Sequence, residues 1–280
     1  MQNNIWKKYK EITQMSSNNY STIYEAKDKS KNIDVIIKEI DLNKYSLYKH
    51  ESFNIENLNK IRTENTVNIF DSYKIDDKYY IIMEKCENLE SYAKRKPFSP
   101  EEIRKLLNQI NGTLKLIKAN NIIYYNLNLN NILVSEENTF KLSDFNSKIV
   151  QNNNLSIEPE ISENNRLSIA PEILKSNNYN EKSDIWSLGV IIYYLLFKKY
   201  PYEANSEFAL LKDIIVSEKN LVLDQIENNN LKDLINKMLK RKLEERLSWD
   251  EYFNHPFFKE ENNNENEKNN EKDYLKNILN

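Results

Sequence analysis

The chain contains 280 residues, of which 39% are hydrophobic, and its formal net charge is −3. This length suffices for one large domain or two coupled lobes, and the nearly balanced charge gives no indication of nucleic-acid binding. Cys86 is the only cysteine, which excludes an internal disulfide, and the longest apolar run, residues 190–197, is too short to span a membrane. Because no apolar signal segment opens the chain, we expect a reducing, cytoplasmic location without a membrane span.

The first part of the chain is predicted to consist of strands and one helix. The predicted strands are rich in β-branched or aromatic residues, are bounded by polar turns, and lie at residues 20–26, 34–40, 67–73 and 78–83. Residues 44–61 form the predicted helix.

Beyond Glu87 the hydrophobic period changes to that of a helix. Ser99-Pro100-Glu101-Glu102 has the pattern of a capping box with proline at the first helical position, and apolar residues follow it at helical spacing. Residues 184–197 are apolar nearly all round, which predicts a buried central helix. The other predicted elements are short strands at 131–134 and 139–142, amphipathic helices at 231–240 and 248–253, and a low-complexity tail at 259–280.

A series of motifs follows these elements in a fixed order. They are Val35-Ile36-Ile37-Lys38, Tyr79-Tyr80-Ile81-Ile82-Met83-Glu84, Asn126-Leu127-Asn128-Leu129-Asn130-Asn131, Asp144-Phe145-Asn146, Ala170-Pro171-Glu172, Ser183-Asp184-Ile185-Trp186-Ser187-Leu188-Gly189-Val190 and Arg246-Leu247-Ser248-Trp249. With these motifs the chain resembles a eukaryotic protein kinase of the Ser/Thr type from about residue 8 to residue 258. The last motif is similar to that of the unc-51-like kinases.

The resemblance implies an α+β fold with two lobes. It places a small antiparallel β-sheet lobe with one helix at residues 1–83 and a hinge at 84–88. A larger, mainly helical lobe follows at 89–258, with the tail at 259–280. It also implies structural roles for Asp184, at the start of the central helix, and for Glu172 and Arg246, which should form a buried ion pair.

The resemblance further implies which residues face a nucleotide. Lys38 falls at the position of the lysine that binds the α- and β-phosphates. Asn131 and Asp144 fall at the positions that bind Mg²⁺, which prefers oxygen ligands. The other nucleotide-binding positions hold Ile23, Ile36, Met83, Glu84, Cys86 and Leu133. ATP with Mg²⁺ is therefore the implied cofactor.

The positions that handle phosphate depart from the kinase pattern. Asn126 replaces the catalytic aspartate, and its neutral amide cannot accept a proton. Asn128 replaces the lysine that contacts the γ-phosphate in Ser/Thr kinases. Ser16, Asn18 and Ser21 stand at the three glycine positions of the phosphate loop, where side chains crowd the phosphates. We therefore expect no working catalytic residue at these positions.

Two further changes bear on nucleotide binding. Ile36 stands where the family usually has alanine, and together with Ile23 and Leu133 it is expected to fill the adenine space. Asn54 stands at the position of the helix glutamate that pairs with the phosphate-binding lysine, and Glu51, one turn earlier, is the available substitute.

The sequence therefore favours a pseudokinase, which is not an enzyme and acts as a protein-binding or allosteric scaffold with weak or absent ATP binding. Its expected partner is another protein, such as an active kinase or a cytoskeletal or trafficking protein. Two alternatives stay open. One is an atypical active Ser/Thr kinase in which Asn126 only orients the substrate, and the other is a nucleotide-binding switch without phosphoryl transfer.

Overall fold

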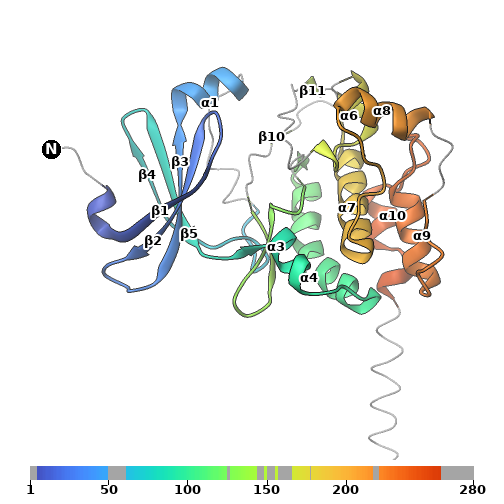
Figure 1. Cartoon of the computed structure of the whole chain (residues 1–280), viewed down its shortest axis with the longest axis horizontal. Helices are drawn as coiled ribbons and strands as arrows, with labels where there is room; N and C mark the ends of the chain where they lie inside the picture. Colours follow the sequence, from blue (N-terminus) through green and yellow to red (C-terminus); the bar gives the residue numbers. More distant parts are fainter. Residues whose placement is uncertain are drawn as a thin grey trace, which may run out of the picture. The chain divides into compact units, whose positions relative to one another are not determined.

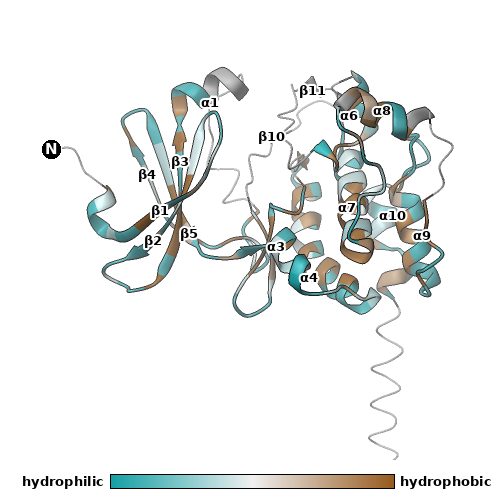
Figure 2. Ribbon diagram, in the orientation of Figure 1, coloured by the Kyte–Doolittle hydropathy of each residue, from teal (hydrophilic) through white to brown (hydrophobic). Residues whose placement is uncertain are grey.

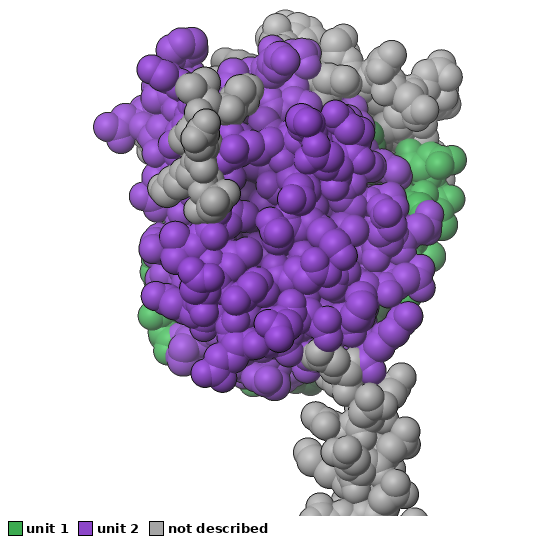
Figure 3. All heavy atoms as spheres, turned by 90° about the vertical axis from the view of Figure 1, so that its right-hand side faces the viewer, with its two compact units in different colours: residues 1–95, 112–151 green, residues 96–111, 152–280 purple. Residues whose placement is uncertain are grey.

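The computed structural model describes residues 5–49, 61–124, 127–143, 148–149, 155–156, 166–176, 178–216 and 221–259. The chain divides into two compact units: unit 1 contains residues 1–95 and 112–151, and unit 2 contains residues 96–111 and 152–280 (Figure 3, green and purple). Helix α4 (Pro100–Ala119) is therefore divided between the two units. Because these units differ from the expected lobes, the lobe boundaries at 84–88 and 259 stay a prediction.

Unit 1 contains a five-stranded antiparallel sheet with the order β1-β2-β3-β5-β4 (Figure 1). Its strands are β1 (Tyr9–Ser17), β2 (Ser21–Asp28), β3 (Asp34–Asp41), β4 (Ile69–Ile75) and β5 (Lys78–Glu84). The last four agree with the predicted strands to within two residues at each end, whereas β1 was not predicted. The short 3-10 helix η1 (Ile5–Lys8) precedes the sheet, and α1 (Leu42–Lys49) is the described part of the helix predicted at 44–61.

Strand β3 contributes buried side chains to a hydrophobic cluster on each face of this sheet. Val35 and Ile37 are 1% and 0% exposed and belong to one cluster, which includes Tyr9 of β1. Ile40 belongs to a second cluster with Tyr45 of α1. Successive side chains of a strand point to opposite faces, so Val35 and Ile37 share one face, and Ile5 of η1 packs in the cluster on that face. Ile36 and Lys38 lie on the other face.

The rest of unit 1 is built from short strands and helix α3. A three-stranded sheet has the order β6-β8-β9, and β7 pairs with β10. The bounds of these elements are β6 (Glu87–Asn88), α3 (Leu89–Arg95), β7 (Ile122–Ile123), β8 (Ile132–Val134), β9 (Phe140–Leu142) and β10 (Lys148–Ile149). Strands β8 and β9 confirm the two short strands predicted around the turn at residues 135–138.

Unit 2 is mainly helical. Besides the first part of α4 it contains α6 (Pro171–Ser176), α7 (Glu181–Phe197), α8 (Glu207–Val216), α9 (Asn229–Met238), α10 (Trp249–Phe253), η2 (Pro256–Phe258) and the strand pair β11 (Leu155–Ser156) and β12 (Asn178–Tyr179). The α+β class, with an antiparallel sheet and a helical part, is confirmed.

The central helix α7 is buried on nearly all sides, as its composition predicts. Figure 2 shows hydrophobic residues along it, and Trp186 and Ile192 are 0% exposed. A β-carbon at Gly189 would lie 3.0 Å from side-chain atoms of both Met238 and Leu239. The small residue at 189 therefore allows α7 to pack closely against the end of α9.

Within the described ranges, none of the helices combines the length and the hydrophobicity that crossing a membrane requires.

Candidate functional site

Unit 1 contains a cavity of about 270 Å³ beside the five-stranded sheet. Ile23 of β2, Ile36 and Lys38 of β3, and Ile81 and Met83 of β5 line it. The antiparallel register explains why these five residues meet. Ile23 lies opposite Lys38 and Lys38 opposite Ile81, while Ile36 lies opposite Met83. Directly opposed residues share a face of a sheet, so one wall of the cavity is this face.

A second wall of the cavity comes from the short strands and loops of unit 1. Leu133 of β8 contributes an apolar side chain, and Asn130 and Asn131 contribute amides from the loop before it. The residues after β5, Cys86 and Asn88, also line the cavity. The structure therefore brings together all the nucleotide-binding positions that the sequence implied: Lys38, Ile23, Ile36, Met83, Glu84, Cys86 and Leu133.

The expectation that Ile36, Ile23 and Leu133 fill the adenine space is wrong. All three keep intermediate exposure and line the cavity of about 270 Å³. Ile36 stands in the wall beside Met83, its cross-strand neighbour, so its extra carbons add to the wall and leave the space in front of it open. The cavity is close to the lower end of the roughly 300–1,000 Å³ range of small-molecule sites.

Lys38 and Glu84 are the charged side chains among the described residues that line this cavity. Lys38 is only 8% exposed. The carboxylate of Glu84 accepts hydrogen bonds from the Lys141 ammonium and from the Asn68 backbone N–H, each at 2.6 Å. Glu84 is thus paired with Lys141, and Lys38 is the positively charged side chain in the cavity wall.

The side-chain amide of Asn128 holds together the loop that carries Asn128 and Asn131. The Oδ1 of Asn128, a residue only 5% exposed, accepts hydrogen bonds from the backbone N–H of Asn130 at 2.9 Å and of Asn131 at 3.2 Å. The Asn131 carbonyl accepts from the backbone N–H and the hydroxyl of Ser143, at 3.0 and 3.1 Å. Asn128, which stands where the resemblance places a lysine, therefore stabilises a turn.

Several expected site residues lie outside the described residues. They are Asn126, Asp144, Glu51 and Asn54, together with Phe145 and Asn146 of the motif that contains Asp144. The pairing of Asn131 with Asp144 around Mg²⁺ and the partner of Lys38 on the helix consequently stay predictions. Within the described residues, His, Cys, Asp and Glu side chains form no group of three or more that could hold a metal ion.

Two other side chains of unit 1 hold nearby backbone segments through hydrogen bonds. Tyr124, which is 0% exposed, donates its hydroxyl hydrogen to the Ser143 carbonyl. Asn88 accepts a hydrogen bond from the Ser91 backbone N–H at 2.8 Å and so caps α3. Burial, reinforced by the Glu84 carboxylate, raises the pKa of the Cys86 thiol to about 12, so this cysteine is a neutral lining group at physiological pH.

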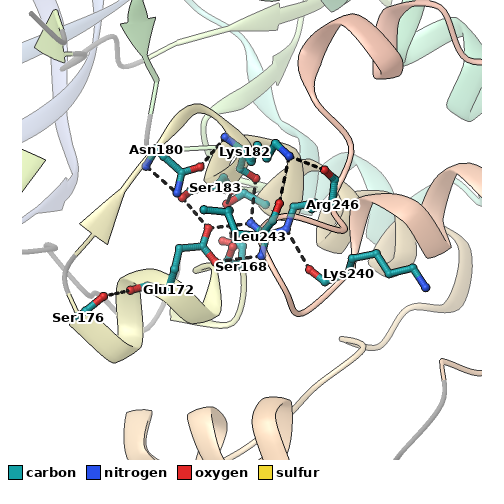
Figure 4. A network of polar contacts seen from close by, with 10 residues as sticks. Ser168, Glu172, Ser176, Asn180, Lys182, Ser183, Lys240, Leu243 and Arg246 are labelled. Carbon is teal, nitrogen blue, oxygen red and sulfur yellow. Dashed lines mark hydrogen bonds and ion pairs between the residues drawn. The ribbon is translucent and has the colours of Figure 1, made fainter. Parts of the chain in front are cut away.

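Unit 2 contains the expected pair of Glu172 and Arg246 (Figure 4). Two parallel bonds join them, from Arg246 Nη1 to Oε1 at 2.7 Å and from Nη2 to Oε2 at 2.9 Å. The Ser183 hydroxyl donates to the same carboxylate at 2.7 Å, and Arg246 also donates to the carbonyls of Lys182 and Lys240, both at 3.0 Å. The Arg246 side chain is 0% exposed and that of Glu172 is 13% exposed, so a buried guanidinium forms a bidentate pair with a largely buried carboxylate.

Asp184 lies in the first turn of α7 and is 2% exposed. Burial raises the pKa of Tyr179, and the Asp184 carboxylate adds to that shift. Asp184 is thus a buried acidic residue at the start of the central helix, where it was expected.

Sequence reasoning missed Lys141 and Asn68, the two partners of Glu84. Neither belongs to a motif, and Lys141 lies 57 positions from Glu84. A signal was present in the strand pattern, since Lys141 interrupts the apolar β9 between the buried Phe140 and Leu142. A charged residue flanked by two buried ones on a short strand points to the opposite face, where it requires a partner.

Comparison with known proteins agrees with the geometry. Residues 9–258 match the protein kinase domain family. The serine/threonine-protein kinase ATG1c of Arabidopsis thaliana is 32% identical over 261 residues, which cover 87% of this chain and 34% of that protein. The serine/threonine-protein kinases ULK3 and ULK1 of Homo sapiens are each 29% identical, over 87% and 85% of this chain.

The chain spans only part of these relatives. It covers 53% of the length of ULK3 and 24% of the length of ULK1. The resemblance to Ser/Thr kinases of the unc-51-like type is confirmed by these similarities, which extend over most of the present chain.

Proposed function

Since the chain belongs to the protein kinase domain family, we propose that it is a pseudokinase that binds an adenine nucleotide with little or no phosphoryl transfer. It then acts through a protein partner, as a scaffold or an allosteric module. The cavity in unit 1 supports nucleotide binding, and the neutral residues at 126 and 128 support the loss of transfer. The protein would therefore combine the scaffold role expected from the sequence with nucleotide binding as a switch.

The observation that carries the proposal is the position of Asn128. Its side chain bonds the backbone N–H groups of Asn130 and Asn131 within its own loop. An amide used in this way contributes no positive charge to a transferring phosphoryl group, and loss of one such electrostatic contact costs about 10²–10³ in rate. The neutral Asn126 removes general-base help, which is worth roughly 10²–10⁴ in rate.

Nucleotide binding is supported by Lys38 and by the apolar wall of the cavity. An apolar slot with a few convergent polar groups is the usual form of a small-molecule site. Lys38 and Asn131 are the described residues that would hold the phosphate end of ATP and its Mg²⁺ ion, and Ile23, Ile36 and Leu133 would contact the base. Bound Mg²⁺ would neutralise phosphate charge.

An active kinase is the second candidate, because the relatives are described as serine/threonine-protein kinases. It would use Mg-ATP, with Asn126 orienting the substrate hydroxyl. We place either form of the protein in the cytoplasm, with a protein partner such as an active kinase or a cytoskeletal or trafficking protein.

Two measurements on the purified chain test the proposal. Isothermal titration with ATP, with and without Mg²⁺, should show saturable binding that Lys38→Met weakens. Incubation with radiolabelled ATP and generic protein substrates should give no more label than the Lys38→Met control. Binding without label supports the pseudokinase, label above the control supports the active kinase, and neither binding nor label leaves only the scaffold.

A further inference from the structure

A single carboxylate oxygen in unit 1 joins three segments that border the cavity. Glu84 Oε1 accepts a hydrogen bond from Lys141 Nζ at 2.6 Å and another from the Asn68 backbone N–H at 2.6 Å. The side chains of Lys141 and Glu84 are 14% and 19% exposed. Bonds between a carboxylate and a cation strengthen as water is excluded, so this junction is stronger than a pair on the open surface.

Each of the three segments carries a residue of the cavity wall next to the junction. Glu84 follows Met83 at the end of β5, and Asn68 precedes Ile69 at the start of β4. Lys141 of β9 lies directly opposite Leu133 of β8. Met83, Ile69 and Leu133 all line the cavity. The bond between Glu84 and Lys141 therefore links the wall of the five-stranded sheet directly to the wall that contains β8.

Backbone hydrogen bonds near Glu84 add further links between the same segments, besides the Glu84–Lys141 bond. The Glu84 N–H donates to the Asn68 carbonyl at 2.9 Å, and the Val67 N–H donates to the Leu142 carbonyl at 2.9 Å. Arg62 donates to the Asn68 side chain at 2.8 Å. These bonds hold the segment before β4 against both β5 and β9, and the Lys141 bond adds the direct link between β9 and the end of β5.

Other ion pairs of the sheet provide a contrast. Lys78 pairs with Glu39 at 2.6 Å at the opposite end of β5, and the Lys78 side chain is 46% exposed. That pair joins neighbouring strands β3 and β5 of one sheet. The Glu84–Lys141 pair instead joins strands of two different sheets. Loss of the Glu84–Lys141 pair would therefore remove a link between the two sheets, whereas loss of the Lys78–Glu39 pair would not.

We propose that Glu84 and Lys141 are positioning residues that hold the cavity of unit 1 at the width an adenine base requires. This inference rests on the proposed nucleotide binding. The pair acts on the base end of the ligand through the positions of Met83 and Leu133, and it makes no contact with phosphate. Because preorganisation of a site is lost when its supporting bonds are removed, breaking the pair weakens binding.

Titration with two probes tests this inference. Lys141→Met keeps the apolar stem of the side chain and removes its charge, whereas Lys141→Arg keeps a donor. We expect Lys141→Met to raise the Kd for ATP and for adenosine by the same factor, about tenfold, which corresponds to a coupling within the range known for interacting residues. Lys141→Arg should stay near wild type, and the control Lys78→Met should leave both Kd values unchanged.

The equality of the two factors distinguishes positioning from direct contact. Adenosine lacks phosphates, so a larger loss for ATP than for adenosine would show that Lys141 acts on phosphate and would overturn the inference. A lower melting temperature of Lys141→Met with both Kd values unchanged would also overturn it, since that pattern is expected of a purely structural pair.

A second readout needs no ligand and uses Cys86, the only cysteine of the chain. Its thiol lines the cavity, and the Lys141 charge lowers its pKa while Glu84 and burial raise it. Electrostatics alone would therefore slow alkylation by iodoacetamide in Lys141→Met, because the thiolate is the reactive form. A wider cavity would instead speed alkylation, because local opening gives the reagent better access to the thiol.

The two readouts separate failure of the inference from failure of the proposed function. If the wild-type chain binds neither ATP nor adenosine, the proposed nucleotide binding fails, and the alkylation rates still decide whether the pair positions the cavity wall. Alkylation that is unchanged or slower in Lys141→Met would overturn the inference, and faster alkylation with Lys141→Arg at the wild-type rate would support it.

Discussion

The cluster around Glu172 in unit 2 and the loop at residues 127–131 in unit 1 differ in what their polar side chains do. In the first, a carboxylate and a guanidinium meet in a bidentate pair whose arginine side chain is 0% exposed. In the second, the amide of Asn128 bonds its own turn. A charged pair thus joins α6 to the segment before α10, and a neutral side chain stands where the resemblance to kinases places a lysine.

Under the proposed pseudokinase function, folding constrains the chain more than catalysis does. A buried charge without its partner costs several kcal/mol of stability, so neither Glu172 nor Arg246 can change alone without harming the fold. Replacing a catalytic side chain by a neutral one has no such cost when the new residue satisfies nearby backbone groups. Asn128 meets that condition, because it bonds the N–H groups of Asn130 and Asn131.

Removing the Glu172 carboxylate should have the largest effect on stability. Glu172→Ala leaves the buried Arg246 guanidinium without its carboxylate, and we expect the free energy of unfolding to fall by about 3–5 kcal/mol. Urea denaturation followed by circular dichroism measures the loss. The control is Glu245→Ala, which breaks an exposed pair with Lys242 and should change stability by less than about 0.5 kcal/mol. Similar losses in both variants would show that the buried pair has no special role.

Substitutions at the two glycines test how tightly helices α7 and α4 are packed. Gly189→Ala places a β-carbon 3.0 Å from Met238 Cβ and from Leu239, and we expect a loss of about 1–3 kcal/mol from overpacking. Gly112→Ala, in the middle of α4, meets no atom within 4 Å and should gain roughly 0.5–1 kcal/mol from reduced backbone freedom of the unfolded chain. Thermal unfolding of the two variants should therefore shift in opposite directions, and equal shifts would contradict the packing described for α7.

Substitution of Asn128 in the loop at residues 127–131 should have a smaller effect on stability. Asn128→Leu removes the acceptor of the Asn130 and Asn131 N–H groups, and we expect a loss of about 1 kcal/mol. Asn128→Asp keeps an acceptor oxygen and should stay close to wild type in the same unfolding measurement. If Asn128→Leu is as stable as wild type, the turn does not depend on this side chain, and its neutral amide would need another explanation.

The smallest effect concerns the pH dependence of unit 2. Burial lowers the pKa of His255 below its ordinary value of 6.5, against the opposing influence of Asp233. The unfolded chain therefore binds a proton more readily, so this contribution to stability is present above about pH 6.5 and declines as the pH falls. We expect the unfolding free energy to fall less between about pH 7 and about pH 5 in His255→Asn than in wild type. Equal slopes would contradict the lowered pKa.

The sequence predicted most strands of unit 1 and the central helix, because these have clear hydrophobic patterns. Strand β1 was missed, since all its residues after Tyr9 are exposed and so show no alternation. Helix α7 begins at Glu181, three residues before the predicted start, because the capping box of Asn180 and Ser183 precedes the apolar run. Local patterns thus predict buried segments and fail where an element is exposed or ends in polar caps.

Within the candidate site, the sequence predicted which residues line the cavity and failed on its openness. The lining follows from the kinase motifs and the strand register, which places Ile36 opposite Met83. Whether Ile36 closes the space depends on how far β8 lies from the sheet, and that distance follows from contacts such as the one between Glu84 and Lys141, 57 positions apart. The pattern of β9 marks Lys141 as a charged residue between two buried ones, but it does not show which distant residue pairs with it.

The loss of phosphoryl transfer is tested most directly by a single-turnover measurement at saturating ATP and Mg²⁺, on wild type, Lys38→Met and Asn126→Asp. We expect wild type and Lys38→Met to give the same background. We also expect Asn126→Asp alone not to rise above this background, because Asn128 still bonds its own loop. Transfer by the wild-type chain above the Lys38→Met background would show instead that this kinase domain is an enzyme.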